Sequence, residues 1–404
     1  MKNISDKNIK RELYLKKVRP FYKKQLIKVL TGQRRVGKSK ILLQIQSELK
    51  EKYPKGNFIF IDKEKFEFDQ IKNYKDLMLF VNNSSKNGVN FLFIDEVQEI
   101  EEFEKALRSL LSTGNYDIYC TGSNAHIFSG NLATVLSGRQ TEIKIHGLSY
   151  NEFLYFHNLK NTNESLNKYF KYGGLPYLIY LPDNENIIGE YLNNVITTVL
   201  YRDVIGRNNI RDIQFLNNLL KFIADNTGSL LSANNISKYL KSQKVSKSVS
   251  VIINYITFLV DANIITRSPR MDIQGLKIFE TGEKYYFEDI GLRNILLGYR
   301  ARDINKIIEN IVYNHLIINE YKVFTGKSSD KEIDFIAMKN NEQIYIQVAY
   351  KLSDEKVIKR EFGNLDEIKD HYPKYVISTD EFPINTSYKG IKHIKLKDFL
   401  SHKI

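Results

Sequence analysis

Short apolar runs alternate with helix-like segments over roughly the first 150 residues. The runs are nearly continuous, which is typical of strands that are buried on both faces of a parallel sheet. Five of them predict strands, at residues 26–30, 57–62, 90–96, 116–124 and 141–145. Between them, segments such as 41–49 and 103–111 space their apolar residues as amphipathic helices do. The pattern therefore predicts an α/β domain with helices on both faces of a five-stranded parallel sheet.

The pattern changes after this domain, and we divide the chain into 1–150, 151–208, 209–298 and 299–404. The second segment is mainly helical around a Gly-Gly-Leu-Pro sequence at 173–176, and we expect a small helical lid over the ligand site. The third contains three amphipathic helices and then two strand candidates, which is the order of a winged helix. Such a module either reads DNA or serves as a protein–protein wedge. The fourth segment returns to an α/β pattern.

Composition adds limits on the class of protein. The chain has 404 residues, of which 42% are apolar and 26% charged, as in ordinary globular proteins. It has no apolar run of the roughly 20 residues that a membrane span needs, and no secretory signal. The single cysteine, Cys120, excludes an intrachain disulfide. We therefore expect a cytoplasmic protein without membrane contact. The net charge of +13 favours a polyanion such as DNA as a partner.

The first chemical motif is Gly-Gln-Arg-Arg-Val-Gly-Lys-Ser at 32–39, between the first predicted strand and the first helix. This is the context of a phosphate-binding loop. The Lys38 ammonium reaches the β- and γ-phosphates of a nucleotide, and the Ser39 hydroxyl is placed to hold Mg²⁺. The positive end of the following helix favours the same anion. The residues expected to bind ATP are Gly32, Gln33, Arg34, Arg35, Val36, Gly37, Lys38, Ser39 and Lys40.

Two acidic residues, Asp95 and Glu96, end the third predicted strand. Ligands of parallel sheets bind beyond the carboxyl ends of the strands, so this pair is expected beside the phosphate loop. We expect Asp95 to hold the magnesium through water and Glu96 to act as general base on the attacking water. The predicted reaction is the hydrolysis of ATP.

Three other positions each have two explanations. Ser123 and Asn124, at the end of the fourth strand, either hydrogen-bond the γ-phosphate or its attacking water, or form a turn or helix cap. Arg139 either reaches the γ-phosphate of a neighbouring subunit in a homo-oligomer or caps its own helix. The basic segment 1–25, which includes Arg11, is either a nucleic-acid arm or a helix with a solvated charged face, and we favour the helix.

These motifs and their order resemble the AAA+ ATPases, and most closely the prokaryotic AAA_14 family with a C-terminal DUF4143 region. The resemblance is carried by residues 27–39, 93–98, 121–124, 136–139 and 148–153. It implies that residues 32–40 form the Walker A motif and that Asp95 and Glu96 form Walker B. It also implies that Asn124 is sensor 1 and that Arg139 is an arginine finger.

The last segment is similar to the PD-(D/E)xK nucleases. Glu309, Asp334 and Gln347 fall on the helix and the two strands of that signature. Ala349 stands where the signature has a lysine, and Lys351 lies one step further along the same face of the strand. A neutral amide is a poorer ligand for a hard cation than a carboxylate is. We therefore expect little or no DNA cleavage from this degenerate site.

Together these features predict an AAA+ ATPase that acts with DNA through its C-terminal half. Two alternatives stay open. One is an ATP switch that hydrolyses slowly and docks a protein partner, and the other is an ATP-gated nuclease. ATP turnover measured with and without DNA separates the ATPase from the switch.

Overall fold

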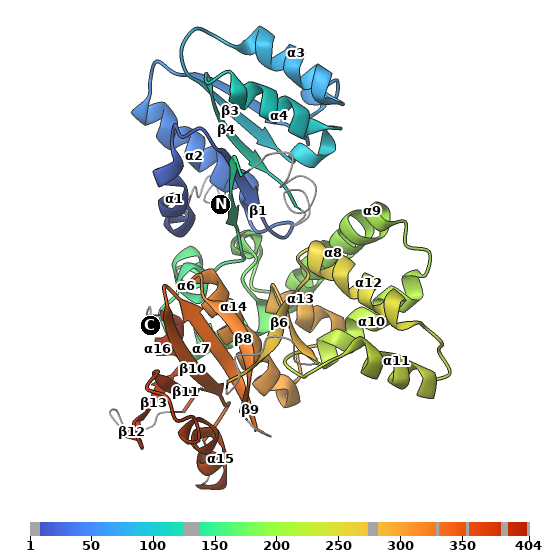
Figure 1. Ribbon diagram of the computed structural model, residues 1–404, viewed down its shortest axis with the longest axis vertical. Coiled ribbons are helices and arrows are strands. Elements are labelled where there is room, and N and C mark those ends of the chain that lie inside the picture. Colours follow the sequence, from blue (N-terminus) through green and yellow to red (C-terminus); the bar gives the residue numbers. More distant parts are fainter. Residues whose placement is uncertain are drawn as a thin grey trace. The chain divides into compact units, whose positions relative to one another are not determined.

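The structure is a computed structural model of the chain. It describes residues 9–123, 138–273, 282–328, 331–352, 355–380 and 387–401. The chain forms two compact units (Figure 1). The first contains the residues up to 146 together with 261–263, and the second contains residues 147–260 and 264–404.

A five-stranded parallel sheet forms the centre of the first unit. Its strands are β1 (Ile27–Thr31), β2 (Asn57–Asp62), β3 (Asn90–Asp95), β4 (Tyr116–Thr121) and β5 (Gln140–Lys144). In space they follow the order β2-β3-β4-β1-β5, and every neighbouring pair is parallel. The apolar runs of the sequence coincide with these strands to within a few residues, so the predicted parallel sheet is confirmed.

Helices cover both faces of this sheet (Figure 1). They are α1 (Glu12–Val18), α2 (Lys38–Lys52), α3 (Tyr74–Ser84) and α4 (Phe103–Ser112), with the short turns η1 (Arg19–Phe21), η2 (Phe66–Phe68) and η3 (Val97–Glu99). Because side chains alternate along a strand, Leu92 and Ile94 of β3 share the core with α3 and α4. Phe93 points to the other face and stacks on Tyr119, with 5.0 Å between ring centroids. This two-sided burial explains why the strands read as unbroken apolar runs.

The second unit combines helices with a larger sheet. Its helices are α6 (Tyr150–His157), α7 (Asn163–Tyr172), α8 (Glu185–Val199), α9 (Gly206–Asn208), α10 (Ile213–Asp225), α11 (Ala233–Ser242), α12 (Val249–Asp261), α13 (Ile290–Leu297), α14 (Ile304–Ile318), α15 (Glu355–Asp366) and α16 (Leu396–Ser401). The 3₁₀ helices η5 (Pro176–Tyr180) and η7 (Ala301–Asp303) and the π-helix η6 (Leu200–Ile205) connect some of them. In the described part of the chain, no helix is long and apolar enough to cross a bilayer.

Eight strands form the sheet of the second unit. They are β6 (Ile265–Asp272), β7 (Glu283–Phe287), β8 (Lys322–Ser328), β9 (Lys331–Lys339), β10 (Glu342–Val348), β11 (Lys374–Ser378), β12 (Ser387–Tyr388) and β13 (Ile391–Lys395). The order in space is β12-β13-β11-β10-β9-β8-β6-β7. Strand β6 pairs with β7 in a hairpin and, through residues 270–272, with β8. The hairpin that follows α10, α11 and α12 is therefore continuous with the C-terminal strands, a long-range pairing that the sequence pattern did not indicate.

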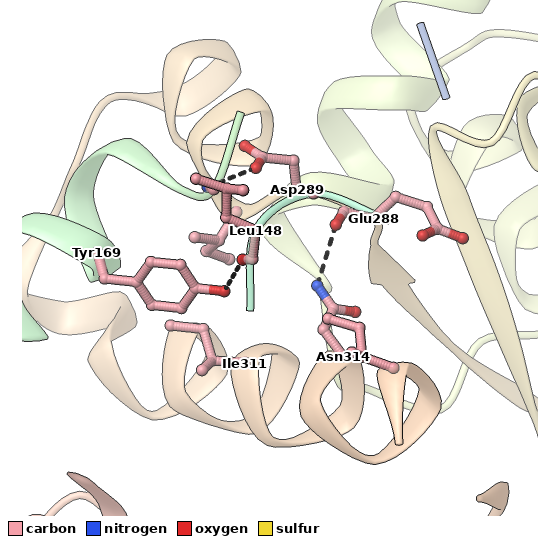
Figure 2. Close-up of a pocket in the computed structure, with 10 residues that line it drawn as sticks. Leu148, Tyr169, Glu288, Asp289, Ile311 and Asn314 are labelled. Carbon is pink, nitrogen blue, oxygen red and sulfur yellow. Dashed lines mark hydrogen bonds between the residues drawn. The ribbon is translucent and has the colours of Figure 1, made fainter. Parts of the chain in front are cut away.

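A buried carboxylate connects distant segments of the second unit (Figure 2). Asp289 caps α13 by accepting hydrogen bonds from the N–H groups of Gly291 at 2.9 Å and Leu292 at 3.2 Å. It also accepts a hydrogen bond from the N–H of Gly174 at 2.7 Å. Burial raises the pKa of Asp289 to about 6, although these hydrogen bonds oppose the shift. A Cβ at Gly173 would lie 2.2 Å from the carboxylate, which explains the glycine pair at this turn.

The cavity drawn in Figure 2 belongs to this junction. It measures about 10 Å³, which is the space of roughly one water molecule. On its walls, the Tyr169 hydroxyl donates to the carbonyl of Leu148 at 2.9 Å, and the Asn314 amide donates to the carbonyl of Glu288 at 3.2 Å. We conclude that the cavity is part of the packed interior and not a ligand site.

Candidate functional site

The phosphate loop connects β1 to α2. Gly32 follows the strand with φ of +132°, and a Cβ at this position would lie 2.1 Å from the carbonyl oxygen of Ile145. Only glycine permits such a close approach between backbone segments. Gly37, with φ of +96°, immediately precedes Lys38, the first residue of α2. The strand, the glycine loop and the helix thus follow one another as the sequence motif requires.

Two buried polar side chains belong to this loop. Lys38 is 4% exposed, and its ammonium donates to the carbonyl oxygens of Gly32 and Gln33, both at 3.0 Å. The Gln33 side chain is 2% exposed, and among the described residues neither atom of its amide has a hydrogen-bond partner. Buried polar groups are normally paired. A buried ammonium and an unpaired amide in a glycine loop fit an anionic ligand such as a phosphate chain.

The end of β3 lies beside the start of α2. Asp95 is 3% exposed and accepts hydrogen bonds from the hydroxyl groups of Thr121, at 2.5 Å, and Ser39. Burial raises the pKa of Asp95 above its usual value, and the two hydrogen bonds oppose that shift. A nearby cation would stabilise the charged carboxylate. The carboxylate and the Ser39 hydroxyl are also the kind of oxygen ligands that Mg²⁺ takes.

Glu96 is held at both its backbone and its side chain. Its φ and ψ are both 54°, in the left-handed region that non-glycine residues seldom occupy. The backbone N–H donates to the Thr121 hydroxyl oxygen at 2.9 Å. The carboxylate accepts a hydrogen bond from the Gln98 amide, which also lies 3.4 Å from the Ser123 hydroxyl. Strained backbone of this kind is frequent at functional sites.

Thr121 is a site residue that sequence analysis missed. It is the last residue of β4, which lies between β1 and β3 in the sheet. Its hydroxyl donates to Asp95 and accepts from the N–H of Glu96, so one side chain positions both acidic residues. The sequence shows only that the fourth strand ends in polar residues. The order of the strands, which the sequence pattern does not contain, selects Thr121 for this place.

Arg11 is a second residue whose role was not anticipated. The sequence counts it among the charges of a solvated N-terminal helix, but Arg11 is 3% exposed. Its guanidinium donates to the carbonyl oxygens of Val36 and His146, both at 2.9 Å, and lies 4.5 Å from the centre of the Tyr14 ring. Since Val36 belongs to the phosphate loop, Arg11 fixes the backbone of that loop. No local signal distinguishes it from the neighbouring lysines.

Three further residues of the first unit were predicted at the site. Asn124 lies outside the described residues. Ser123 is 1% exposed, and its carbonyl lies 3.5 Å from the Asn263 amide. Arg139 is exposed immediately before β5, and its backbone carbonyl accepts a hydrogen bond from the N–H of Ile27 at 2.9 Å. The Arg139 side chain is therefore at the surface of this unit.

Comparison with known proteins identifies the family. The family model AAA_14, described as an AAA domain, matches residues 24–154. A protein of Haemophilus influenzae described as uncharacterized is 35% identical over 400 residues, which span 97% of this chain and 98% of that protein. The chain belongs to the AAA_14 family. A second relative, an uncharacterized protein of Methanocaldococcus jannaschii, is 31% identical over 81% of this chain and 75% of its own length.

The AAA_14 assignment agrees with the fold. A Walker-type ATPase of Pyrococcus abyssi superposes with a TM-score of 0.51 at 17% identity, over 71% of this chain and 95% of that one. At this level of identity the likeness concerns the fold alone. Residues 163–303 match a different family model, a domain of unknown function named DUF8612. That region thus matches a family of unknown function, and the DUF4143 resemblance of the C-terminal part stays a prediction.

The second unit of this AAA_14 protein has a polar pocket of about 510 Å³. The four residues of the proposed degenerate nuclease site, Glu309, Asp334, Gln347 and Lys351, all line it. Burial raises the pKa of Asp334 well above its usual value, the charge of Glu309 adds to the shift, and the charge of Lys284 opposes it. Lys284, on β7, lies far from these residues in sequence and was not predicted at the site.

The role of Thr121 can be tested by substitution. Thr121→Val removes the hydroxyl and leaves the Asp95 carboxylate and the Glu96 N–H without that partner. We expect the free energy of unfolding to fall by about 1–3 kcal/mol, as for other buried hydrogen-bonding groups that lose a partner. Urea unfolding measures the change. Thr121→Ser keeps the hydroxyl, and its free energy of unfolding should fall by less than about 1 kcal/mol. Equal stability of Thr121→Val and the wild type would contradict this role.

Proposed function

We propose that the first unit binds ATP together with Mg²⁺ and hydrolyses it. The observation that supports this most strongly is a hydrogen-bonded chain at the carboxyl edge of the sheet. The first hydrogen bond of this series joins Ser39 to Asp95, next to the phosphate loop. Thr121 extends it to the backbone of Glu96. Membership of a P-loop AAA+ family supports the same activity.

The phosphate loop supplies the binding groups in this proposal. The N–H groups of the loop and of the first turn of α2 hold the phosphates, and the Lys38 ammonium pairs with their charge. Gln33, whose buried amide lacks a partner among the described residues, adds a neutral donor. Ser39 and Asp95 would hold Mg²⁺, which when bound neutralises negative charge on the phosphates.

Glu96 is the proposed general base. Its carboxylate takes a proton from the attacking water, and Gln98 keeps that carboxylate oriented through its amide. Thr121 fixes the backbone from which the Glu96 side chain projects. Asn124 remains the proposed sensor of the γ-phosphate, in line with the family resemblance.

Arg139 is proposed as an arginine finger that acts on the site of a neighbouring copy of the chain. Its guanidinium is exposed, whereas its backbone is fixed by the hydrogen bond from Ile27. A fixed backbone with an exposed cationic side chain suits a contact across a subunit interface. Fingers of this kind contribute ~10³–10⁵ in rate in well-studied GTPases.

The proposed DNA contact lies on α11 and the turn that follows it. Residues 226–260 contain four lysines and no acidic residue. The lysines are Lys238, Lys241, Lys244 and Lys247. Lys247 pairs with Asp212, and the other three lysines are exposed. Helix α12, the third helix of this module, carries no basic residue. We therefore place the phosphate contacts on α11 and its turn.

A slow ATP switch that docks a protein partner is the second candidate. Tyr239 and Val245, in the lysine-rich segment, are 49% and 39% exposed, and Ile253 on α12 is 48% exposed. Exposed apolar side chains of this kind suit a protein surface as well as a nucleic acid. The ATP-gated nuclease is supported less well, because Gln347 and Ala349 replace the acidic residue and the lysine of the nuclease signature.

The general-base assignment predicts different defects for two variants. Glu96→Gln should bind ATP normally but lose turnover by ~10²-fold or more, since an amide does not accept a proton from water. Lys38→Ala should instead weaken ATP binding, because it removes a cation from the phosphates. Steady-state ATPase and nucleotide-binding assays separate the two effects. Glu99→Gln, at an exposed neighbouring carboxylate, is the control.

Steady-state ATPase activity should also be measured for the protein alone, with single-stranded DNA and with duplex DNA. Turnover that rises with DNA supports the DNA-coupled ATPase, and slow turnover that DNA leaves unchanged favours the switch. Wild-type turnover in Glu96→Gln would show that another group is the base.

The finger assignment predicts that turnover depends on assembly. Arg139→Ala should lower ATP turnover and leave ATP affinity nearly intact, because the finger acts on charge that develops during reaction. In the wild type, turnover per subunit should rise with protein concentration as subunits associate. Arg108→Ala, at an exposed arginine of α4, is the control. Turnover per subunit that stays constant on dilution would argue for a monomer without a finger in trans.

The DNA contact predicts a change in salt dependence. Lys241→Glu combined with Lys244→Glu should weaken duplex binding and reduce the slope of log K against log salt by about 2, one for each lost phosphate contact. Fluorescence anisotropy over a salt series measures both quantities. Lys50→Glu combined with Lys55→Glu changes the net charge equally on exposed positions of the first unit and is the control. Equal weakening by both pairs would mean that net charge alone drives binding.

A further inference from the structure

A buried lysine lies among the acidic residues at the polar pocket of the second unit. Lys284 is 2% exposed on β7. Its ammonium nitrogen lies 2.8 Å from Glu309 Oε1 and 2.7 Å from Glu332 Oε1. Asp334 Oδ1 is 3.7 Å from the same nitrogen. Three carboxylates from α14 and β9 therefore surround one internal cation.

The ammonium is charged in this setting. Burial by itself would lower the pKa of Lys284, but the charges of Glu309, Asp334 and Glu332 outweigh burial and hold the pKa above its usual value. A second cation close to this ammonium would be repelled, with little water between the two to screen the repulsion.

The oxygens of the pocket are also engaged by donors of the protein. Glu309 Oε1 accepts from the Tyr286 hydroxyl at 2.7 Å in addition to Lys284. Asp334 Oδ2 accepts from the N–H of Val348 at 2.8 Å. The Gln347 side-chain carbonyl accepts from the N–H of Asp334 at 3.3 Å. Among the described residues, no three acidic, histidine or cysteine side chains are arranged to hold a metal ion. The residues present therefore do not fit the divalent cation that a nuclease of the resembled type requires.

Lys351 does not supply the missing lysine of the nuclease signature in this arrangement. Its side chain is exposed, and its nitrogen lies 5.4 Å from the centre of the Tyr350 ring. The lysine that contacts the acidic residues comes instead from β7, which precedes α14 in the chain. The cation at Asp334 is thus covalently part of the protein.

We propose that the Lys284 ammonium takes the place of a divalent cation at Glu309, Glu332 and Asp334. The pocket is then a structural site with its own internal counter-ion, and it binds no metal. This proposal does not depend on ATP hydrolysis by the first unit. It also gives a physical reason to expect little or no metal-dependent cleavage, because the ligand oxygens already have a permanent counter-ion.

The proposal is tested by titrating the full chain with Mn²⁺ in the absence of nucleotide. Electron paramagnetic resonance measures how much Mn²⁺ is bound. The wild type should bind no Mn²⁺ that depends on Asp334, so Asp334→Asn should leave its binding curve unchanged. Lys284→Met should gain one Mn²⁺ site that the wild type lacks, because its three carboxylates lose their counter-ion. Adding Asp334→Asn to Lys284→Met should abolish the gain. Lys374→Met, which removes a lysine paired with Asp370 away from the pocket, should gain nothing.

Two results would overturn the proposal. One is Mn²⁺ binding by the wild type that Asp334→Asn removes, and the other is a folded Lys284→Met protein that gains no site. Should Lys284→Met not fold, the comparison of the wild type with Asp334→Asn still decides, because it requires no change at Lys284. DNA nicking in Mg²⁺ that disappears in Asp334→Ala would count against the proposal as well.

Discussion

A buried charge in this protein is matched by an opposite charge or by hydrogen bonds from the chain itself. Lys28 and Asp117 form a buried ion pair between β1 and β4. Arg293, fully buried, pairs with Asp303 at 2.8 Å. The Arg11 guanidinium donates to the backbone carbonyls of Val36 and His146. An unpaired charge removed from water is penalised by several kcal/mol, so each of these groups fixes the segments that satisfy it.

The phosphate loop is where this requirement is only partly met. The Gln33 amide is buried without a partner among the described residues, and the pKa of the buried Asp95 is raised. Groups of this kind are stabilised by a ligand of the right charge, which gives the nucleotide site its physical basis. The site is rigid at the same time, because Arg11 holds the loop and Thr121 holds the acidic pair. Binding energy is then not spent on ordering the loop.

In the polar pocket of the second unit, by contrast, the polar groups named above already have partners within the protein. Its carboxylates face an ammonium from the same chain, and its amide and carboxylate oxygens accept hydrogen bonds from the backbone. A site that is satisfied internally gains little from a metal. Since β6 joins the hairpin to the C-terminal strands, Lys284 is held in that position by a continuous sheet. The pocket is consequently poorly suited to hold a catalytic metal.

The sequence by itself determined the local features of this protein. Three kinds of feature were predictable, because each depends only on a run of neighbouring residues. They are the five strands, the phosphate loop from Gly32 to Ser39 and the acidic pair Asp95–Glu96. The three helices before the hairpin were predictable for the same reason. An apolar period or a glycine motif needs only a few adjacent positions to be recognised.

Only the tertiary structure decided which distant residues complete the sites. Thr121 reaches Asp95 because β4 lies between β1 and β3, and no local pattern contains that order. Arg11 and Lys284 look like ordinary surface lysines and arginines in the sequence, yet both are buried. Their partners lie 25 or more positions away, at Val36 and Glu309. Charge and hydrogen bonding act through space, so their partners are chosen by the packing of the sheets and not by the neighbours in the chain.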